Sequence, residues 1–244
     1  RQTEVQPNQI VEVEVDFAMA SDISGPILIR AFEEMGARKV FDTTKVAIVV
    51  DHWSPNRDIE TAAAAAKLRR FASRHGIAHF FEAGDGVEHV LLPERGLVRP
   101  GDLVVAGDSH TVTYGALGAF ATGVGSTDLA AVFALGRTWL KVPPTIRVEF
   151  TGQLPPWVGG KDLILFFLGQ VGTDGALYRA VEFAGSVIRE LGMDDRFTIC
   201  NMVVEAGAKN GIIEADERTM AYSQGRGVAL RSDEGAQYER TLSF

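Results

Sequence analysis

Three proton-handling side chains stand in succession where an apolar segment ends. The run Leu-Val-Val-Ala at residues 103–106 is typical of a buried strand, and Gly107 then leads into Asp108, Ser109 and His110. Open α/β folds bind their ligands at the carboxyl ends of strands. A carboxylate, a hydroxyl and an imidazole at such an edge can bind a polar ligand and move protons. The alternative is a turn that bonds its own backbone, but the position at a strand end favours a functional site.

A second carboxylate and imidazole follow another predicted buried strand, at residues 45–50. Asp51 and His52 are adjacent, an arrangement that can hold a proton donor in one tautomer and raise its pKa, although a capped loop is the competing interpretation. His89 follows a predicted strand at residues 78–82 through a glycine-rich loop that could bring it beside His52. Taken singly, His89 is more typical of a polar surface residue.

Two further patterns carry weaker signals. Asn201 and Glu205 are four residues apart, which predicts one helix face where an amide and a carboxylate can act on one ligand, or else an exposed polar face. The glycine-rich run at residues 115–128 lacks the lysine and the acidic residue of nucleotide-binding loops, so we expect its glycines to allow close backbone approach. We assign structural roles to His75, at a predicted helix end, and to His79, in a predicted strand.

Strand-like and helix-like patterns alternate along the chain, which predicts an α/β fold with largely parallel sheets. The predicted strands cover residues 11–15, 45–50, 78–82, 103–106, 145–150 and 180–183, and the predicted helices cover residues 26–35, 59–75, 127–135, 161–171, 187–191 and 199–205. Pro143 and Pro144 disfavour both helix and sheet. We therefore expect two domains, residues 1–143 and 144–244.

Composition narrows the class of protein. The chain has 244 residues, 46% of them hydrophobic, and a formal net charge of -8, which argues against a nucleic-acid partner. No apolar stretch approaches the roughly 20 residues that span a membrane. The single cysteine, Cys200, allows no intrachain disulfide and favours a cytoplasmic protein. The chain begins with Arg1 rather than Met, which predicts a natural start further upstream.

Together, these segments resemble the aconitase superfamily, and within it the large subunits of 3-isopropylmalate dehydratase and homoaconitase. The resemblance covers nearly the whole chain, and the motif at residues 107–111 with its glycine-rich sequel is highly specific. The matching segments, in order, are Asp51-His52, His89 before Pro93-Glu94, Gly107-Asp108-Ser109-His110-Thr111, the glycine-rich run, Cys200-Asn201-Met202 and Ala206-Gly207-Ala208-Lys209. The resemblance implies three-layer αβα domains.

The resemblance also implies an activity, that of a hydro-lyase which removes water from a hydroxy-di- or tricarboxylate and adds it back on the adjacent carbon. A 4Fe-4S cluster with one open iron would act as Lewis acid. Asp51 and His52 would protonate the departing hydroxyl, and Asn201 and Glu205 would lie by the open iron and its water. The implied catalytic residues are Asp51, His52, His89, Asp108, His110 and Glu205, and the implied substrate contacts are Ser21, Ser109 and Asn201. At Ser21 the aconitases carry a glutamine instead.

The sulfur content departs from the family pattern. Family members hold the cluster with three cysteines in a later region, and this chain has only Cys200, which matches a position outside that set. We therefore expect the front portion of a large subunit, lacking its start and its cluster-bearing third domain and inactive alone. The implied partners are a small swivelling subunit and a hydroxy-dicarboxylate substrate, with neither nucleic acid nor membrane.

Several functions remain open at this point. The leading hypothesis is interconversion of 2- and 3-isopropylmalate in leucine biosynthesis, and the nearest rival is homoaconitase in lysine biosynthesis. A rival from another class is a zinc hydrolase in which His52, His89 and His110 bind the metal directly. A third alternative is a non-catalytic interaction module that keeps the α/β scaffold.

Overall fold

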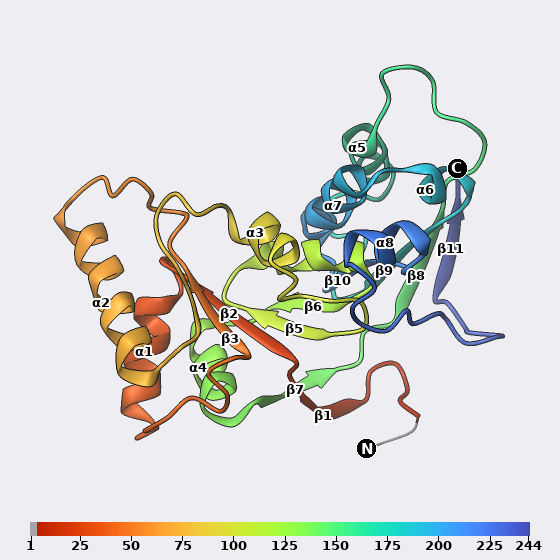
Figure 1. The fold of residues 1–244 in the computed structure, drawn as a ribbon. Helices are drawn as coiled ribbons and strands as arrows, with labels where there is room; N and C mark the ends of the chain where they lie inside the picture. The colour runs from red at the N-terminus through yellow and green to blue at the C-terminus, as the bar shows by residue number, and fades with distance from the viewer. Residues whose placement is uncertain (1–3) are drawn as a thin grey trace.

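The computed structural model describes residues 4–244, whose strands form a five-stranded sheet, a four-stranded sheet and a two-stranded ribbon (Figure 1). Arg1, on which the expected upstream start rests, lies outside the described residues. Within the part of the chain that is described, no helix has the length and apolar character needed to cross a lipid bilayer.

The five-stranded sheet is entirely parallel and carries helices on both faces. Its strand order is β4-β3-β2-β5-β6, with β2 at Phe17–Ser21, β3 at Val46–Val49, β4 at His79–Phe81, β5 at Leu103–Ala106 and β6 at Phe120–Gly123. One face is covered by α1 (Gly25–Glu34), α2 (Ile59–His75) and α4 (Ser126–Leu135), and the other by α3 (Glu88–Glu94) and the 3-10 helix η1 (Ser109–Leu117). This is the expected three-layer arrangement.

Alternation along β2 shows how the layers are held together. Ala18 and Ala20 belong to the apolar cluster shared with α1, α2 and α4, whereas Phe17 and Met19 belong to the cluster on the opposite face. Successive side chains of a strand point to opposite faces, so a central parallel strand is buried on both. All five residues of β2 are buried. Because β2 is the central strand of the sheet, the residues that follow its carboxyl end lie between those that follow β3 and β5.

The four-stranded sheet is also parallel and has the strand order β10-β9-β8-β11. Its strands are β8 (Thr145–Glu149), β9 (Ala180–Ala184), β10 (Asn210–Ile213) and β11 (Arg240–Ser243), and the nearby helices are α5 (Gly160–Val171), α6 (Ser186–Glu190), α7 (Met193–Met202), the 3-10 helix η2 (Val203–Ala206) and α8 (Glu217–Tyr222). Val148 and Phe183 pack into one apolar cluster with Phe167 of α5 and Ile199 of α7.

Helix α2 illustrates local agreement between sequence and structure. Asp58 precedes the helix and accepts a hydrogen bond of 2.8 Å from the backbone N–H of Thr61, which satisfies a donor of the first turn. Gly76 ends the helix with φ 66°, a left-handed conformation that glycine adopts without steric cost. The alanine-rich interior between these two signals favours helix. The predicted helix at residues 59–75 is confirmed.

The predicted half-exposed strand near residues 11–15 is confirmed as β1 (Ile10–Glu14), which pairs antiparallel with β7 (Arg137–Lys141). The expected boundary after residue 143 falls between β7 and β8. The division of the chain into two domains there stays a prediction.

One strand was missed, and two expectations of local structure were wrong. The segment before β3 contains the central strand β2, which was not predicted because Ala-rich Phe17–Ser21 lacks a clear period. His89 lies in the first turn of α3 rather than in a loop. The helix predicted at residues 199–205 begins earlier, at Met193, and its α-helical part ends at Met202, so that Glu205 lies in the following 3-10 turn.

The helix η1 packs against both sheets, and one glycine makes this possible. A Cβ atom placed on Gly115 would lie 1.6 Å from the carbonyl oxygen of Gly211 in β10, a distance that no relaxation of a side chain can relieve. Gly115→Ala is therefore expected to lower the free energy of unfolding by about 1–3 kcal/mol, as overpacking does in other cores. Denaturant titration measures the change.

The matched control is Gly169→Ala on α5, where nothing lies within 4 Å of the added Cβ. An alanine in an open helix position is expected to stabilise by about 0.5–1 kcal/mol. Equal free energies of unfolding for the two variants would contradict the close contact between η1 and β10.

Candidate active site

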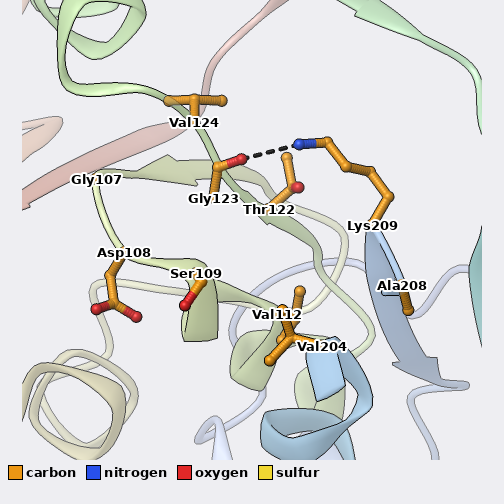
Figure 2. Close-up of a pocket in the computed structure, with 10 residues that line it drawn as sticks. All are labelled: Gly107, Asp108, Ser109, Val112, Thr122, Gly123, Val124, Val204, Ala208 and Lys209. Carbon is orange, nitrogen blue, oxygen red and sulfur yellow. Dashed lines mark hydrogen bonds between the residues drawn. The ribbon is translucent and has the colours of Figure 1, made fainter. Parts of the chain in front are cut away.

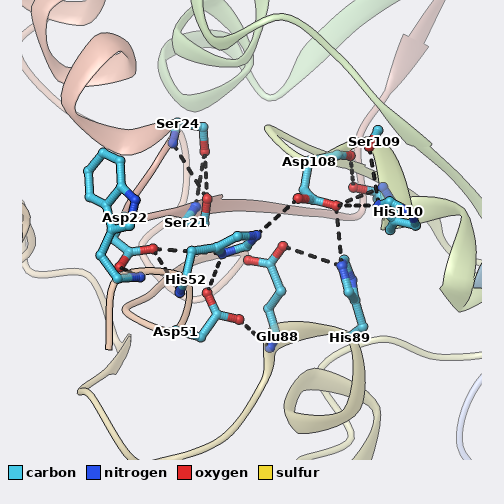
Figure 3. Close-up of polar contacts among 12 residues, drawn as sticks. Ser21, Asp22, Ser24, Asp51, His52, Glu88, His89, Asp108, Ser109 and His110 are labelled. Carbon is cyan, nitrogen blue, oxygen red and sulfur yellow. Dashed lines mark hydrogen bonds and ion pairs between the residues drawn. The ribbon is translucent and has the colours of Figure 1, made fainter. Parts of the chain in front are cut away.

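The candidate site lies where three neighbouring strands of the first sheet end. Asp22 follows β2, Asp51 and His52 follow β3, and Asp108 follows β5 (Figure 3). Parallel strands direct their carboxyl ends to the same edge, so residues far apart in sequence meet there. Asp22 was missed in the sequence because β2 itself was missed. An acidic residue directly after an apolar segment was the available signal.

Each of three histidines is paired with a carboxylate. His52 Nδ1 lies 2.7 Å from Asp51 Oδ1, His89 Nε2 lies 3.2 Å from Asp108 Oδ1, and His110 Nε2 lies 3.3 Å from Glu205 Oε1. A further contact joins the pairs, because His52 Nε2 lies 3.3 Å from Asp108 Oδ2. His110 Nδ1 in turn lies 3.8 Å from Asp108 Oδ1. The six residues predicted to be catalytic therefore form one connected set.

Buried backbone contacts hold this set in place. Asp22, which is fully buried, accepts hydrogen bonds from the backbone N–H groups of His52 at 3.1 Å and Trp53 at 2.8 Å. Asp51 Oδ2 accepts a hydrogen bond of 2.7 Å from the backbone N–H of Glu88, in the first turn of α3. The loop after β3 is thus fixed from one side by Asp22 and itself fixes the start of α3, which places His89.

Asp108 is the centre of the network. Its Oδ1 accepts a hydrogen bond of 2.7 Å from the backbone N–H of His110, which caps η1. Burial by itself would raise the pKa of Asp108, but the contacts from His52 and His89 outweigh it and hold the pKa well below its ordinary value. Asp108 is therefore ionised and faces two imidazoles.

His52 carries the proton in this arrangement. The carboxylates of Asp108 and Asp51 raise the pKa of His52 to about 10, so the ring is an imidazolium at neutral pH. Its side chain is 29% exposed, whereas that of Asp51 is only 4% exposed. The imidazolium is thus held rigidly from behind and remains open toward a ligand, the geometry that a general acid requires.

Glu88 is a functional candidate that the sequence analysis passed over. Its residue is fully buried, and burial, followed by the negative charges of Asp51 and Asp108, raises the pKa of its carboxyl to about 9. A signal was present, because Glu88 directly precedes His89. Acid and imidazole neighbours at 51 and 52 were recognised, but the same pairing at 88 and 89 was not.

The remaining predicted residues lie around this core in different ways. The hydroxyl of Ser109 is 3.2 Å from His110 Nδ1. The side-chain amide of Asn201 donates a hydrogen bond of 2.9 Å to the Thr113 hydroxyl rather than sharing a helix face with Glu205. Ser21 is buried and its hydroxyl contacts that of Ser24 at 3.3 Å. Substrate contacts from these residues stay predictions.

The two histidines assigned structural roles lie outside the network. His75 packs edge-on against Phe32, with ring centroids 5.3 Å apart, at the end of α2. His79 Nε2 lies 3.1 Å from the carbonyl oxygen of Thr44. Neither ring has a contact with the residues of the candidate site among the interactions of the described chain.

A cavity of about 300 Å³ adjoins the network (Figure 2). Asp108 and Ser109 line it together with Lys209, whose ammonium donates a hydrogen bond of 2.9 Å to the Gly123 carbonyl. The expected close approach of the glycine-rich run is confirmed, because a Cβ on Gly123 would lie 2.5 Å from the backbone oxygen of Asp108. A volume of this size suits a small ligand.

The chain does not contain the donor set of an iron-sulfur cluster. Such clusters are held by several thiolates, and Cys200 is the single cysteine of the sequence. Its side chain is fully buried, and burial raises the pKa of the thiol, which keeps it protonated. No cluster-dependent chemistry can therefore be assigned to residues of this chain.

The three histidines proposed for zinc do not form a ligand set either. Among residues 4–244, the groups of three whose potential ligand atoms all lie within 4.8 Å of one another combine one histidine with carboxylates: Asp22, Asp51 and His52, and His52, Glu88 and Asp108. His52 and His89 each direct Nε2 at Asp108 instead of at a shared point. This geometry speaks against the zinc hydrolase.

Comparison with known proteins places the chain among relatives of one kind. The model of the aconitase family (aconitate hydratase) matches residues 2–243. The 3-isopropylmalate dehydratase large subunit of Nitratidesulfovibrio vulgaris is 57% identical over 240 residues, which cover 97% of this chain and 57% of that protein. The large subunit of the same name from Aquifex aeolicus is 53% identical, over 99% of this chain and 57% of that protein. The one from Moorella thermoacetica is 55% identical, over 98% of this chain and 58% of that protein.

Proposed function

Because the chain belongs to the aconitase family, we propose that it is part of the large subunit of a 3-isopropylmalate dehydratase. This hydro-lyase would interconvert 2- and 3-isopropylmalate by removing water and adding it back on the adjacent carbon. The curated relatives named above are all called 3-isopropylmalate dehydratase large subunits, which favours isopropylmalate over homoaconitate as substrate. Since the chain spans about 57% of the length of its relatives, the activity belongs to a larger assembly.

The observation that carries the proposal is the position of the His52 ring, whose Nδ1 lies 2.7 Å from Asp51 Oδ1 and whose Nε2 lies 3.3 Å from Asp108 Oδ2. Both carboxylates raise the pKa of His52 to about 10, which favours the imidazolium. Departure of a hydroxyl group from carbon requires a proton, and a partly exposed imidazolium is placed to donate it. Asp51 would orient the ring through Nδ1, leaving Nε2 and its proton toward Asp108 and the ligand. On rehydration the same ring would take the proton back.

The other two pairs would serve the substrate rather than the leaving group. His89 and His110 flank Asp108, and His110 also contacts Glu205 of η2. The two imidazole rings could donate hydrogen bonds to the carboxylates of a hydroxy-dicarboxylate substrate. Substrate contacts from Ser109 and Asn201 belong to the same proposal, and Ser21 would act from the buried side of the edge.

The proposed enzyme needs two parts that this chain does not supply, the ligands of an iron-sulfur cluster and a small subunit. We propose that the cluster ligands lie in the part of the relatives' length that this chain does not span, and that a small subunit completes the enzyme. When bound, the cluster would supply Lewis-acid chemistry. This chain would contribute the acid that protonates the departing hydroxyl, and the base that removes the proton from carbon would come from the rest of the assembly. A cytoplasmic location is proposed with it, supported by the single buried cysteine.

Reconstitution tests the proposal. The chain is expected to show no interconversion of 2- and 3-isopropylmalate alone, and to gain it when fused to the remaining segment of the Nitratidesulfovibrio vulgaris large subunit and combined with the small subunit, iron and sulfide. Product formation is followed by chromatography, with homoaconitate as the competing substrate.

Each other outcome points to a different function. A complete, cluster-loaded assembly that dehydrates neither substrate would support the non-catalytic module. Stoichiometric zinc in the purified chain, without iron or sulfide, would support the hydrolase. Preference for homoaconitate would leave the hydro-lyase in place and change its substrate.

A further inference from the structure

We propose that Glu88 is a neutral carboxylic acid in the folded protein and that it is a positioning residue, which sets how tightly the neighbouring His52 holds its proton. The neutral state rests on the geometry of this chain. The positioning role rests in addition on the proposed function, in which His52 is the acid that protonates the departing hydroxyl.

The Glu88 side chain is buried in the site, and its carboxyl group has no hydrogen-bond partner among the described residues. Its backbone N–H donates to Asp51 Oδ2 at 2.7 Å, and its carbonyl oxygen accepts from the hydroxyl of Tyr114 at 3.1 Å. With the backbone held at both ends, the side chain cannot turn outward to water.

Figure 3 shows the Glu88 carboxyl between the rings of His52 and His89, facing Asp108. The nearest imidazole nitrogen, His89 Nε2, lies 3.7 Å from Oε1, beyond hydrogen-bond distance. The titratable groups that face it are Asp22 after β2, Asp51 and His52 after β3, His89 on α3, and Asp108, His110 and Tyr114 at η1.

These neighbours make an ionised Glu88 unfavourable. Asp22, Asp51 and Asp108 already place three carboxylates around His52, and each of them accepts hydrogen bonds that Glu88 lacks. A buried carboxylate without donors takes up a proton rather than remain charged. The pKa of Glu88, raised to about 9 by burial and then by Asp51 and Asp108, agrees with that reasoning.

A bound cation is the alternative way to neutralise Glu88, and the contacts of its neighbours disfavour it. His52, Glu88 and Asp108 do have potential ligand atoms within 4.8 Å of one another. However, the ring nitrogens of His52 face Asp51 and Asp108, and the Asp108 oxygens face His52 and His89. Of these three residues, only Glu88 has carboxyl oxygens without a hydrogen-bond partner among the described residues, and one uncommitted carboxyl group is too few for a metal site.

The neutral state matters for proton transfer. While Glu88 is protonated, the carboxylates that retain the His52 proton are those of Asp51 and Asp108. Ionisation of Glu88 would add another negative charge beside the ring and hold the proton more tightly. A more tightly held proton makes a weaker general acid. His52 is therefore the stronger acid at pH values below the pKa of Glu88, where Glu88 is neutral, and the weaker acid above it.

The first test reads the proton on Glu88 directly. The chain is prepared with ¹³C-labelled glutamate carboxyl groups, and Glu88→Gln identifies the resonance of Glu88 by its loss. Glu94→Gln, at the exposed end of the same helix, is the matched control. The Glu88 resonance is expected to have the chemical shift of a protonated acid at pH 7 and to titrate with a midpoint near 9. A midpoint below pH 6 would overturn the proposal.

The same spectra show whether a proton or a bound cation neutralises the Glu88 carboxyl group. If the Glu88 resonance moves when a chelator is added and returns when Mg²⁺ or Zn²⁺ is restored, a metal ion rather than a proton neutralises the group and the proposal fails. A Glu88 resonance that does not move on addition of the chelator or of the metal ion supports the proposal.

The second test reads the positioning role. The His52 ring is followed by ¹⁵N resonances in the wild-type chain and in Glu88→Gln, whose amide has the same shape but cannot ionise. The His52 midpoint is expected to be lower in Glu88→Gln by about one pH unit, because the charge gained by ionised Glu88 is missing. An unmoved midpoint would reduce Glu88 to a structural residue. Both tests measure whether a side chain carries a proton. Their outcome therefore does not depend on whether the assembled enzyme has dehydratase activity.

Discussion

Replacing His52 with alanine, in the dehydratase assembled around this chain, is expected to lower turnover by a factor of about 10² to 10⁴. The His52 ring is held between the carboxylates of Asp51 and Asp108 at the carboxyl end of the sheet, and its loss leaves the departing hydroxyl without a proton donor. The side chain is partly exposed and belongs to none of the apolar clusters, so the variant is expected to fold, with its stability lowered by the loss of the contacts to Asp51 and Asp108. Steady-state kinetics and thermal unfolding measure the two effects separately.

His79→Ala is the matched control for this substitution. His79 lies in β4 of the same sheet and contacts the Thr44 carbonyl, away from the carboxylate network. Its replacement is expected to leave turnover within about twofold of the wild type, since it removes no acid-base group. If folded His52→Ala enzyme turned over as fast as the His79→Ala control, His52 would not be the acid.

Asp108→Asn is expected to move the pH dependence of the enzyme toward acid and to lower turnover by about 10²-fold at pH 8. The Asp108 carboxylate is the main cause of the raised pKa of His52, which lies near 10 instead of 6.5. An amide of the same shape cannot balance the imidazolium. The pKa of His52 therefore falls toward its ordinary value, and at pH 8 a smaller fraction of the ring carries the proton. The profile of kcat/KM against pH measures the shift.

The same substitution changes how stability depends on pH. His52 binds its proton more tightly in the folded chain, so its contribution to stability is complete below pH 6.5 and is lost as the pH rises through about 10. Glu88, whose pKa is also raised, acts in the same direction between pH 4.5 and about 9. The free energy of unfolding of the wild-type chain is therefore expected to fall over this range, and to fall less in Asp108→Asn.

A carboxylate outside the network provides the comparison for both measurements. Asp85 accepts a hydrogen bond from the backbone N–H of Glu82 in the turn before α3 and does not contact a histidine of the site. Asp85→Asn should keep the wild-type pH profile. A high-pH limb that is the same in Asp108→Asn and Asp85→Asn would show that Asp108 does not hold the His52 proton.

Local features of the sequence were sufficient for the parts of the site that are contiguous. Residues 51 and 52 follow an unbroken apolar run, and residues 108–110 follow another by way of Gly107, so hydrophobic patterning placed both at strand ends. The glycine-rich run also announced a close approach, which Gly115 and Gly123 make against neighbouring backbone. Helix signals at Asp58 and Gly76 were equally local.

Strand order was not readable in the same way. Strand β2 comes first among the strands of its sheet and yet lies at its centre, between β3 and β5, because parallel strands are joined by crossovers whose order depends on packing. Missing β2 meant missing Asp22, whose buried carboxylate fixes the backbone of His52. The pairing of His110 with Glu205 joins residues 95 positions apart and required the two sheets to meet.

The amino-acid sequence by itself determined that Asp51, His52 and Asp108 follow strand ends, and that one cysteine cannot bind a cluster. The tertiary structure decided which carboxylate faces which imidazole, and therefore where the protons reside. Proton affinity depends on burial and on charges a few ångströms away, and both are set by packing between distant segments. Glu88 makes the difference plain, because an acid that looks ordinary in the sequence becomes, once buried among Asp51, His52 and Asp108, a group that keeps its proton.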